Sequence, residues 1–243
     1  MVSCGDSSQR RTPNAERRTP NAEHHDRAKR GSPPKPDAKA QAKADRYTGD
    51  VTAIVFDLDG TLVDSFDDIS AAFCRSFHVA GCEPPEADVV RQMIGKPLRD
   101  MYAPWVPAET IDALVAEYRR DYSERCAERT RPYPGIVDLL DALRLRGHAL
   151  AVATTKTTWM ASTVLARLGI EDRLDHVQGT DGFPHKPAPD VITHALAGVA
   201  DHPGAGLRTC AVTWGEHSEA QLRKAEPDAV ATTVDELRTL LLK

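Results

Sequence analysis

Hydrophobic residues gather into short β-branched runs and into stretches with helical spacing. The run Val51–Leu58 is apolar and ends in acidic residues and Gly60, which predicts a buried strand that leads into a loop. Segments with helical spacing and many charges follow at Phe66–Phe77, Pro85–Met93 and Ala108–Glu128. These segments predict a small helical unit, and the proline and glycine of Pro132–Gly135 mark its end.

Strands and helices alternate in the rest of the chain. The expected strands are Ala149–Ala153, Asp175–Gly179 and Thr209–Thr213, and the expected helices are Ile136–Arg146, Thr158–Leu168, Pro189–Ala200 and Val234–Leu242. Ser218 begins a further helix, because Gln221 three residues later completes a capping-box pattern. Such alternation predicts right-handed βαβ units and a mainly parallel sheet.

The order of these elements predicts an α/β fold of the Rossmann-like type with a helical insert. Residues 47–66 and 132–243 form the expected core, and residues 67–131 form the expected cap. Because the insert follows the first strand, it lies at the carboxyl edge of the sheet, where open α/β folds bind ligands. This position is the one expected of a lid.

The first 46 residues differ in composition from the rest. They hold 11 Lys/Arg and 6 Asp/Glu, have no aromatic residue, and repeat RRTPNAE at Arg10–Glu16 and Arg17–Glu23. Such a segment buries too little apolar surface to offset its ordering entropy, so we expect residues 1–46 to be a disordered basic tail. The interleaved acids disfavour both an anionic partner and an organellar transit peptide.

The rest of the chain is acidic, with 20 basic and 30 acidic residues out of totals of 31 and 36. Nucleic-acid binding depends on phosphate neutralisation, so we expect no nucleic-acid partner. The five cysteines are scattered and form no C-x-x-C pair, which favours a reducing cytoplasm over a disulfide framework. No apolar run reaches membrane-spanning length, and the N-terminus is not a secretory signal. Nothing in the sequence fixes the oligomeric state.

The acidic pair Asp57 and Asp59 follows the first strand directly, with Gly60 permitting the turn. Two carboxylates at positions i and i+2 of a strand end can reach one crevice. Phosphoryl transfer needs a nucleophile, a proton donor for the leaving oxygen, and cations that spread charge. Taken alone, the D-x-D-G pattern also fits a simple turn or a calcium loop.

The longer string decides between these alternatives. Phe56–Ser65 (FDLDGTLVDS) closely resembles the first motif of the haloacid dehalogenase-like phosphatases, and the resemblance extends with gaps over about residues 51–243. It implies that Asp57 is a nucleophile forming an aspartyl-phosphate, and that Asp59 is the acid and later the base. It also implies that Asp57 and the main-chain carbonyl of Asp59 bind Mg²⁺.

Two further motifs of that family have matches here. Ala149–Lys156 resembles the second motif, which places Thr154 and the following Thr155 at the phosphoryl oxygens. His185–Asp190 (HKPAPD) resembles the third, in which Lys186 holds the phosphate and Asp57 together. The resemblance is strongest to phosphoglycolate phosphatase-like and pyrophosphatase-like members. Lys96 and Arg99 of the cap are further candidates for reading a carboxylate or a second phosphate.

The fourth motif of the family has no match. That motif is a strand ending in Gly-Asp, with a second Asp four or five residues on, and it completes the magnesium site. Here Ala195–Val199 continues through Asp201–Gly206 into Leu207–Gly215, so one strand and one helix of the core are missing as a block. Either Thr209–Thr213 moves beside the first strand, or the sheet has a gap. The candidate replacement acids are Asp181, Asp201 and Glu216, and a real deletion, a degenerate enzyme or a gene-model variant all fit the sequence.

Three functional hypotheses follow. The first is a Mg²⁺-dependent phosphatase acting on a small phosphate monoester such as phosphoglycolate. The second is a catalytically impaired relative that binds phosphate or a partner, because the fourth motif is absent. The third is a phosphomutase, which has the same loop but needs a cap that reads a sugar phosphate.

Overall fold

A parallel sheet of three strands lies at the centre of the α/β part. The computed structural model describes residues 53–199 and 207–242, and within them the strand order is β1 (Ala53–Phe56), β4 (Ala149–Ala153), β5 (His176–Gln178). The register aligns Ala53 with Ala149 and Ala151 with His176. The predicted Rossmann-like α/β fold class is confirmed. The predicted tail of residues 1–46 lies outside the described residues.

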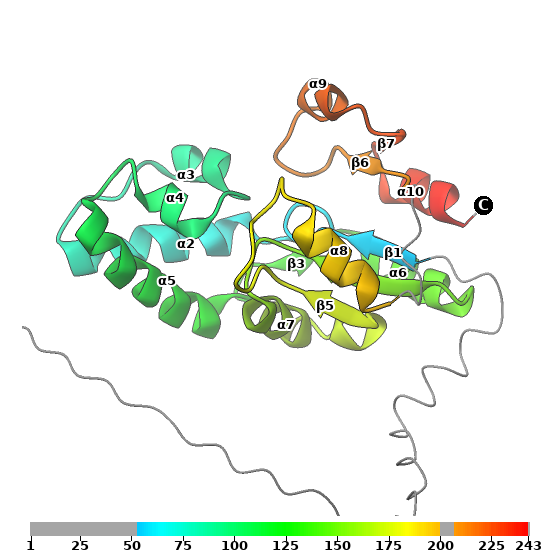
Figure 1. Cartoon of the computed structure of the whole chain (residues 1–243), viewed down its shortest axis with the longest axis horizontal. Coiled ribbons are helices and arrows are strands. Elements are labelled where there is room, and N and C mark those ends of the chain that lie inside the picture. The colour runs from blue at the N-terminus through cyan, green and yellow to red at the C-terminus, as the bar shows by residue number, and fades with distance from the viewer. Residues whose placement is uncertain (1–52, 200–206, 243) are drawn as a thin grey trace, which may run out of the picture.

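Helices cover both faces of this sheet (Figure 1). Every residue of β4 is buried, which explains its uninterrupted apolar sequence ALAVA. Leu150 and Val152 pack in one cluster with α6 (Ile136–Leu145) and α7 (Thr158–Arg167). Ala151 and Ala153, which point to the opposite face, pack with α8 (Asp190–Ala197). The sheet is therefore a central layer between two helical layers.

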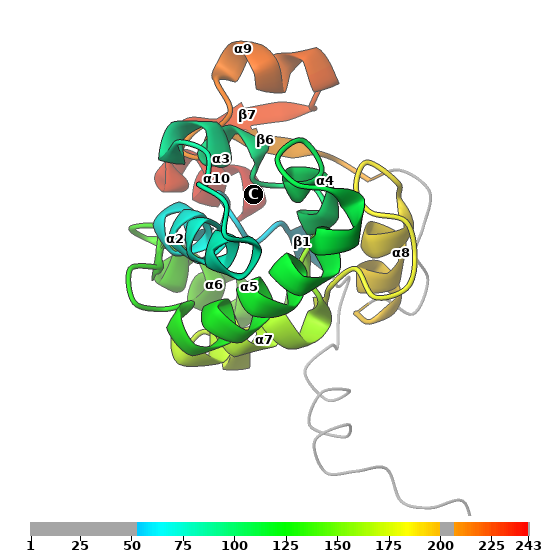
Figure 2. The same cartoon turned by 90° about the vertical axis from the view of Figure 1, so that its left-hand side faces the viewer.

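The helical insert has an aromatic cluster, to which Met160 and Val164 of α7 also belong. It consists of α2 (Phe66–Ser76), α3 (Ala87–Met93), α4 (Leu98–Tyr102) and α5 (Ile111–Arg125), with α2 and α5 side by side in Figure 2. The Phe73 ring stacks on Tyr102 with centroids 4.4 Å apart, and Phe77 meets Phe73 edge-on at 5.3 Å. All three side chains are buried.

The two chain crossings between the insert and the core lie side by side. A short antiparallel ladder joins β2 (Val63–Asp64) to β3 (Arg131–Pro132). Beside it, the buried Asp68 carboxylate accepts hydrogen bonds from the Arg129 and Thr130 amides at 2.9 and 2.8 Å, and from the Thr130 hydroxyl at 2.7 Å. The chain therefore enters and leaves the insert at neighbouring positions that are joined by hydrogen bonds.

The described residues 207–242, here called the C-terminal unit, show how the sheet accommodates the missing strand. It contains β6 (Cys210–Val212), α9 (Glu219–Leu222), β7 (Ala229–Ala231) and α10 (Val234–Leu241). Within the described part of the chain, β6 pairs with β7 in a separate parallel sheet, and β1 pairs with β4 alone. Of the two alternatives, the structure has the gap: β6 and β7 form a sheet separate from β1 (Figure 1).

Most predicted elements occur with small shifts at their ends. The helix expected from Ala108 begins as a 3₁₀ turn, so α5 starts at Ile111, and the helix expected from Pro85 starts at Ala87. The predicted capping box at Ser218 is present. The pattern did not predict α4 or β7, which are short. No helix among residues 53–199 and 207–242 is long and apolar enough to cross a membrane.

Candidate active site

The turn that carries the acidic pair follows β1 without a spacer. β1 ends at Phe56, so Asp57 is the first residue beyond the strand. Gly60 has a φ of 76°, in the left-handed region that favours glycine, and a Cβ there would lie 3.0 Å from Cζ of Phe66. The Leu58 carbonyl accepts hydrogen bonds from the amides of Leu62 and Val63 at 3.0 and 3.1 Å. The backbone of the turn therefore fixes the positions of the Cα atoms from which the Asp57 and Asp59 side chains extend.

Asp57 forms an ion pair with the lysine of the third motif. Lys186 Nζ lies 2.8 Å from Oδ1 of Asp57, and it also donates to the Ala153 carbonyl at 2.7 Å. Ala153 is the last residue of β4, so this one ammonium group links the ends of two neighbouring strands. The Asp57 side chain is 46 % exposed and that of Lys186 is 28 % exposed. The structure thus brings two predicted site residues together at a solvent-accessible edge.

Asp59 has a different environment, and it includes a residue that the sequence reasoning missed. Lys156 Nζ lies 2.6 Å from Oδ2 of Asp59, and the Ser65 hydroxyl donates to Oδ1. The side chains of Asp59 and Lys156 are only 12 % and 10 % exposed. The Lys156 ammonium also lies 5.3 Å from the centre of the Tyr122 ring of α5, a cation–π distance. Lys156 comes two residues after Thr154, in the turn at the same sheet edge. This position in the sequence could have indicated that Lys156 belongs to the site.

Thr154 and Thr155 form the turn between β4 and α7. Thr154 is buried, and its Oγ1 accepts a hydrogen bond from the Lys156 amide at 3.3 Å. Its carbonyl accepts from the Thr180 hydroxyl at 3.0 Å, which ties this turn to the segment after β5. Thr155 is partly exposed in the same turn. Both threonines therefore lie at the strand edge that carries Asp57 and Lys186.

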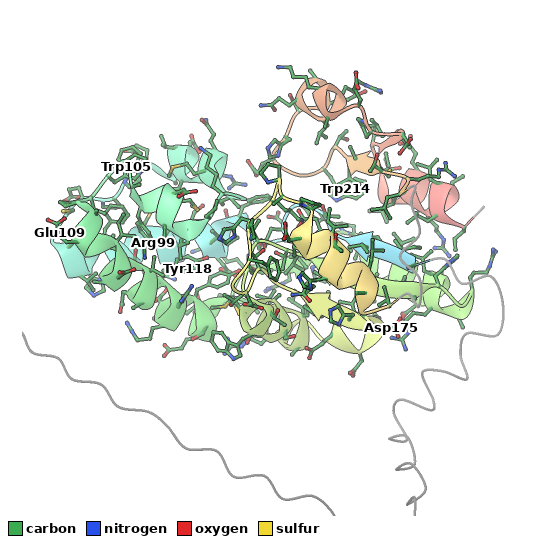
Figure 3. All side chains as sticks on the ribbon, viewed as in Figure 1. Arg99, Trp105, Glu109, Tyr118, Asp175 and Trp214 are labelled. Carbon is green, nitrogen blue, oxygen red and sulfur yellow. The ribbon has the colours of Figure 1, made fainter. Side chains whose placement is uncertain are left out.

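Two tyrosines of α5 extend the helical insert toward this edge. Tyr118 and Tyr122 are stacked with centroids 5.3 Å apart, and both are buried. Burial raises the pKa of each phenol well above its usual value, and the negative charge of Asp59 raises it further. The Tyr122 hydroxyl has no hydrogen-bond partner among the described residues. Figure 3 shows Tyr118 on the insert.

The candidate replacement acids are occupied by other partners. The Asp181 carboxylate accepts from the Thr158 amide at 3.1 Å and from the Thr158 hydroxyl. Glu216 forms an ion pair with Arg91 of α3, with 3.0 Å between Nη2 and Oε1. Asp201 lies outside the described residues. Asp181 and Glu216 therefore stabilise local structure.

The described residues place no third acidic, histidine or cysteine side chain with Asp57 and Asp59 to complete a magnesium site. Mg²⁺ takes six oxygen ligands, usually with one or two carboxylates among them. Nowhere in residues 53–199 and 207–242 do three or more His, Cys, Asp or Glu side chains come together in a group that could hold a metal ion. Each carboxylate of the acidic pair instead has a lysine ammonium within 2.8 Å.

The cap residues proposed to read a substrate are both exposed. Arg99 is on α4 and forms an ion pair with Asp112 of α5, within the helical insert and away from the sheet (Figure 3). Lys96 is exposed in the loop before α4. Among the described residues, neither side chain has a hydrogen bond or ion pair with Asp57, whose partner is Lys186, and their role in reading a substrate stays a prediction.

The C-terminal unit reaches the acidic turn through one short segment. Trp214 donates its indole N–H to the Thr61 carbonyl at 3.1 Å. Gly215 lies so close that a Cβ there would be 2.7 Å from the Gly60 carbonyl oxygen. Trp214 therefore lies between the unit and the core (Figure 3), and the contact to the turn is made by a loop and not by a strand ladder.

Comparison with known proteins identifies the family of the chain. Residues 54–201 match the family described as haloacid dehalogenase-like hydrolase, so the chain belongs to that family. It is 33 % identical over 212 residues to the tyrosine-protein kinase PtkA of Mycobacterium tuberculosis, covering 77 % of this chain and 72 % of PtkA. It is 32 % identical over 155 residues to a phosphoglycolate phosphatase of Aquifex aeolicus, covering 63 % and 73 %. The structure resembles a haloacid dehalogenase-like hydrolase of Streptococcus pneumoniae, with a TM-score of 0.69, 32 % identity, and coverage of 78 % and 98 %.

Proposed function

We propose that the chain is a phosphatase that hydrolyses a small phosphate monoester through a phosphorylated Asp57. The observation that carries the proposal is the contact between Lys186 and Asp57, 2.8 Å apart at an exposed strand edge. A nucleophilic carboxylate needs a cation beside it, because the attacked phosphate is itself an anion. Phosphoglycolate is the first substrate to test, in view of the phosphoglycolate phosphatase relative.

The residues at the carboxyl edge of the sheet have different roles in the proposed hydrolysis. An Asp57 oxygen attacks phosphorus, the bond from phosphorus to the ester oxygen breaks, and Asp59 gives a proton to the leaving alkoxide. Asp59 then takes a proton from the water that attacks the aspartyl-phosphate, which releases inorganic phosphate and restores Asp57. Thr154 and Thr155 hold the phosphoryl oxygens, and Ser65 holds the Asp59 carboxylate in place. The helical insert of residues 67–131 is the proposed cap over this edge.

The family resemblance assigns Mg²⁺ to Asp57 and to the main-chain carbonyl of Asp59, where it would spread the charge of the transferring phosphoryl group. The described side chains do not complete such a site, so no step of the reaction is derived through the ion. The scattered free cysteines favour a cytoplasmic enzyme with a small-molecule substrate.

A second candidate function is favoured by one observation, the absence of a metal-holding group among the described residues. In this alternative the chain binds phosphate, or a partner bearing phosphate, without turnover. Both candidates use the same residues, Asp57 and Lys186, and differ in whether the ester bond is broken.

Hydrolysis assays distinguish the two candidates. Release of phosphate from phosphoglycolate and from p-nitrophenyl phosphate is measured for the wild-type chain, for Asp57→Asn, and for Asp64→Asn as a matched control on an exposed acid near the same loop. We expect turnover that Asp57→Asn abolishes and Asp64→Asn retains. Equal turnover in Asp57→Asn would contradict the mechanism, and phosphate binding without turnover would favour the second candidate. Because one relative is a tyrosine-protein kinase, a parallel assay tests ATP as phosphoryl donor. Release of free phosphate distinguishes a hydrolase from the phosphomutase considered in the sequence analysis, which would keep the phosphoryl group on its product.

A further inference from the structure

The acidic pair is neutralised by two lysines that come from different segments. Lys156, which follows β4, meets Asp59, and Lys186, which precedes α8, meets Asp57. The two carboxylates are two residues apart at the end of one strand, so the two ion pairs are neighbours. The two lysines and the two carboxylates together have a net charge of zero, where two unpaired carboxylates would give −2.

This arrangement disfavours a divalent cation and favours an oxyanion. A magnesium ion bound to either carboxylate would share it with an ammonium group that already lies within 2.8 Å of that carboxylate, and the two positive charges would repel each other. A phosphate dianion that approaches the exposed side of Asp57 would instead meet the Lys186 ammonium directly. The charge that a metal would supply to a bound phosphate is therefore available from lysine.

We propose that this site binds phosphate without a divalent cation, with Lys156 and Lys186 supplying the positive charge. The inference rests on the proposed function, because it takes phosphate to bind beside Asp57. Lys186 contacts the anion, and Lys156 acts as a positioning residue that neutralises Asp59 so that the anion meets no unpaired carboxylate.

The burial and contacts of Lys156 indicate a specific role in the site and not a chance contact at the surface. Surface lysines are mostly solvated, whereas Lys156 is 10 % exposed and its ammonium lies between the Asp59 carboxylate and the Tyr122 ring. Tyr122 belongs to α5, so the helical insert covers this ion pair from outside the core. Asp59 would be left nearly buried and unpaired if Lys156 were removed, and such burial is costly.

The test is a calorimetric titration of the full chain with inorganic phosphate, once in excess EDTA and once in excess MgCl₂. We expect equal affinities in the two conditions, within about twofold. Lys186→Met should weaken binding about ten- to hundredfold, the range for a hydrogen bond to a charged group, and Lys156→Met should weaken it about as much because it leaves the Asp59 carboxylate without a cation near the anion. Lys156→Arg should retain binding within a few-fold, and Lys224→Met, at an exposed lysine of the C-terminal unit, should leave it unchanged.

The outcomes separate this inference from the function on which it rests. Binding at least about tenfold tighter in MgCl₂ than in EDTA would overturn the inference and leave the proposed function standing. No phosphate binding in either condition would overturn both. If Lys156→Met loses binding, circular dichroism spectra establish whether it is folded; wild-type binding in a folded Lys156→Met would overturn the role of Lys156. If Lys156→Arg loses binding but has a native spectrum, the shape of the lysine side chain matters and its positive charge alone does not suffice. This result would also overturn the proposed role of Lys156.

Discussion

The helical insert and the C-terminal unit are held to the molecule in different ways. The insert packs Phe73, Phe77 and Tyr102 in a buried cluster that Met160 and Val164 of α7 complete, and the buried Asp68 carboxylate ties its two ends together. In the described part of the C-terminal unit only Ala231 and Leu237 are buried, and no strand ladder joins the unit to β1. The unit is held instead by α10 packing against α6, by apolar side chains that join the core cluster, by the Trp214 loop, and by the ion pair of Glu216 with Arg91.

The difference shows what a gap in a parallel sheet changes. A continuous ladder would connect the C-terminal strands to β1 through backbone hydrogen bonds along the strand. With the ladder interrupted, the described contacts to the acidic turn are an indole hydrogen bond, a close glycine contact and side-chain packing in the core cluster. We therefore expect substitutions in the insert to affect the whole fold, and those in the C-terminal unit to affect mainly its attachment.

The largest effect is expected from Phe73→Ala in the insert. Phe73 is fully buried and contacts two other aromatic rings, so its removal should lower the free energy of unfolding by about 3–5 kcal/mol. Urea denaturation followed by circular dichroism measures this. Val79→Ala, at an exposed position of the same unit, should change the value by less than about 0.5 kcal/mol. A loss below about 1 kcal/mol for Phe73→Ala would show that the aromatic core is loosely packed.

A smaller effect is expected from Leu237→Ala in the C-terminal unit. Leu237 is buried in one cluster with residues of α6, but apart from Ala231 the residues that the C-terminal unit contributes to this cluster are only partly buried. Its removal should cost about 2 kcal/mol, the lower end of the range for such a substitution. The same denaturation experiment applies, with the exposed Leu145→Ala as control. A loss as large as that of Phe73→Ala would contradict the contrast between the two units.

The smallest effect is expected from Trp214→Phe. This change keeps an aromatic ring beside Tyr133 but removes the N–H that the Thr61 carbonyl accepts. The expected cost is about 1 kcal/mol, the usual net contribution of one hydrogen bond. Proteolysis of the C-terminal unit is a direct readout of its attachment, and Trp159→Phe, at an exposed tryptophan of α7, is the matched control. Equal cleavage rates in the two variants would argue that the indole contact is not used.

The sequence was sufficient for the fold class and for most of the elements. β4 is predictable because its run ALAVA is buried on both faces, and the Ser218 helix is predictable because its capping box is local. By contrast, α4 and β7 are too short to produce a periodic signal. The pairing of β6 with β7, and not with β1, depends on contacts distant in sequence, which left both alternatives open.

The candidate site was predictable where motifs reach it. Asp57 and Lys186 lie 129 residues apart in the chain, yet the family resemblance anticipated that they meet. Lys156 was not anticipated as a partner of Asp59, because its role depends on the packing of α5 over the sheet edge. Glu216 and Asp181 were reasonable replacement ligands by position, and only their contacts with Arg91 and Thr158 show that they are engaged elsewhere.

The most direct test of the central claim is to trap phosphate on Asp57. The chain is mixed with radiolabelled phosphoglycolate, quenched in acid within one turnover, and digested for peptide mapping. We predict label on the peptide that contains Asp57, sensitive to hydroxylamine as an acyl phosphate should be, and absent from Asp57→Asn. Turnover without any labelled intermediate, or label that persists in Asp57→Asn, would contradict the account.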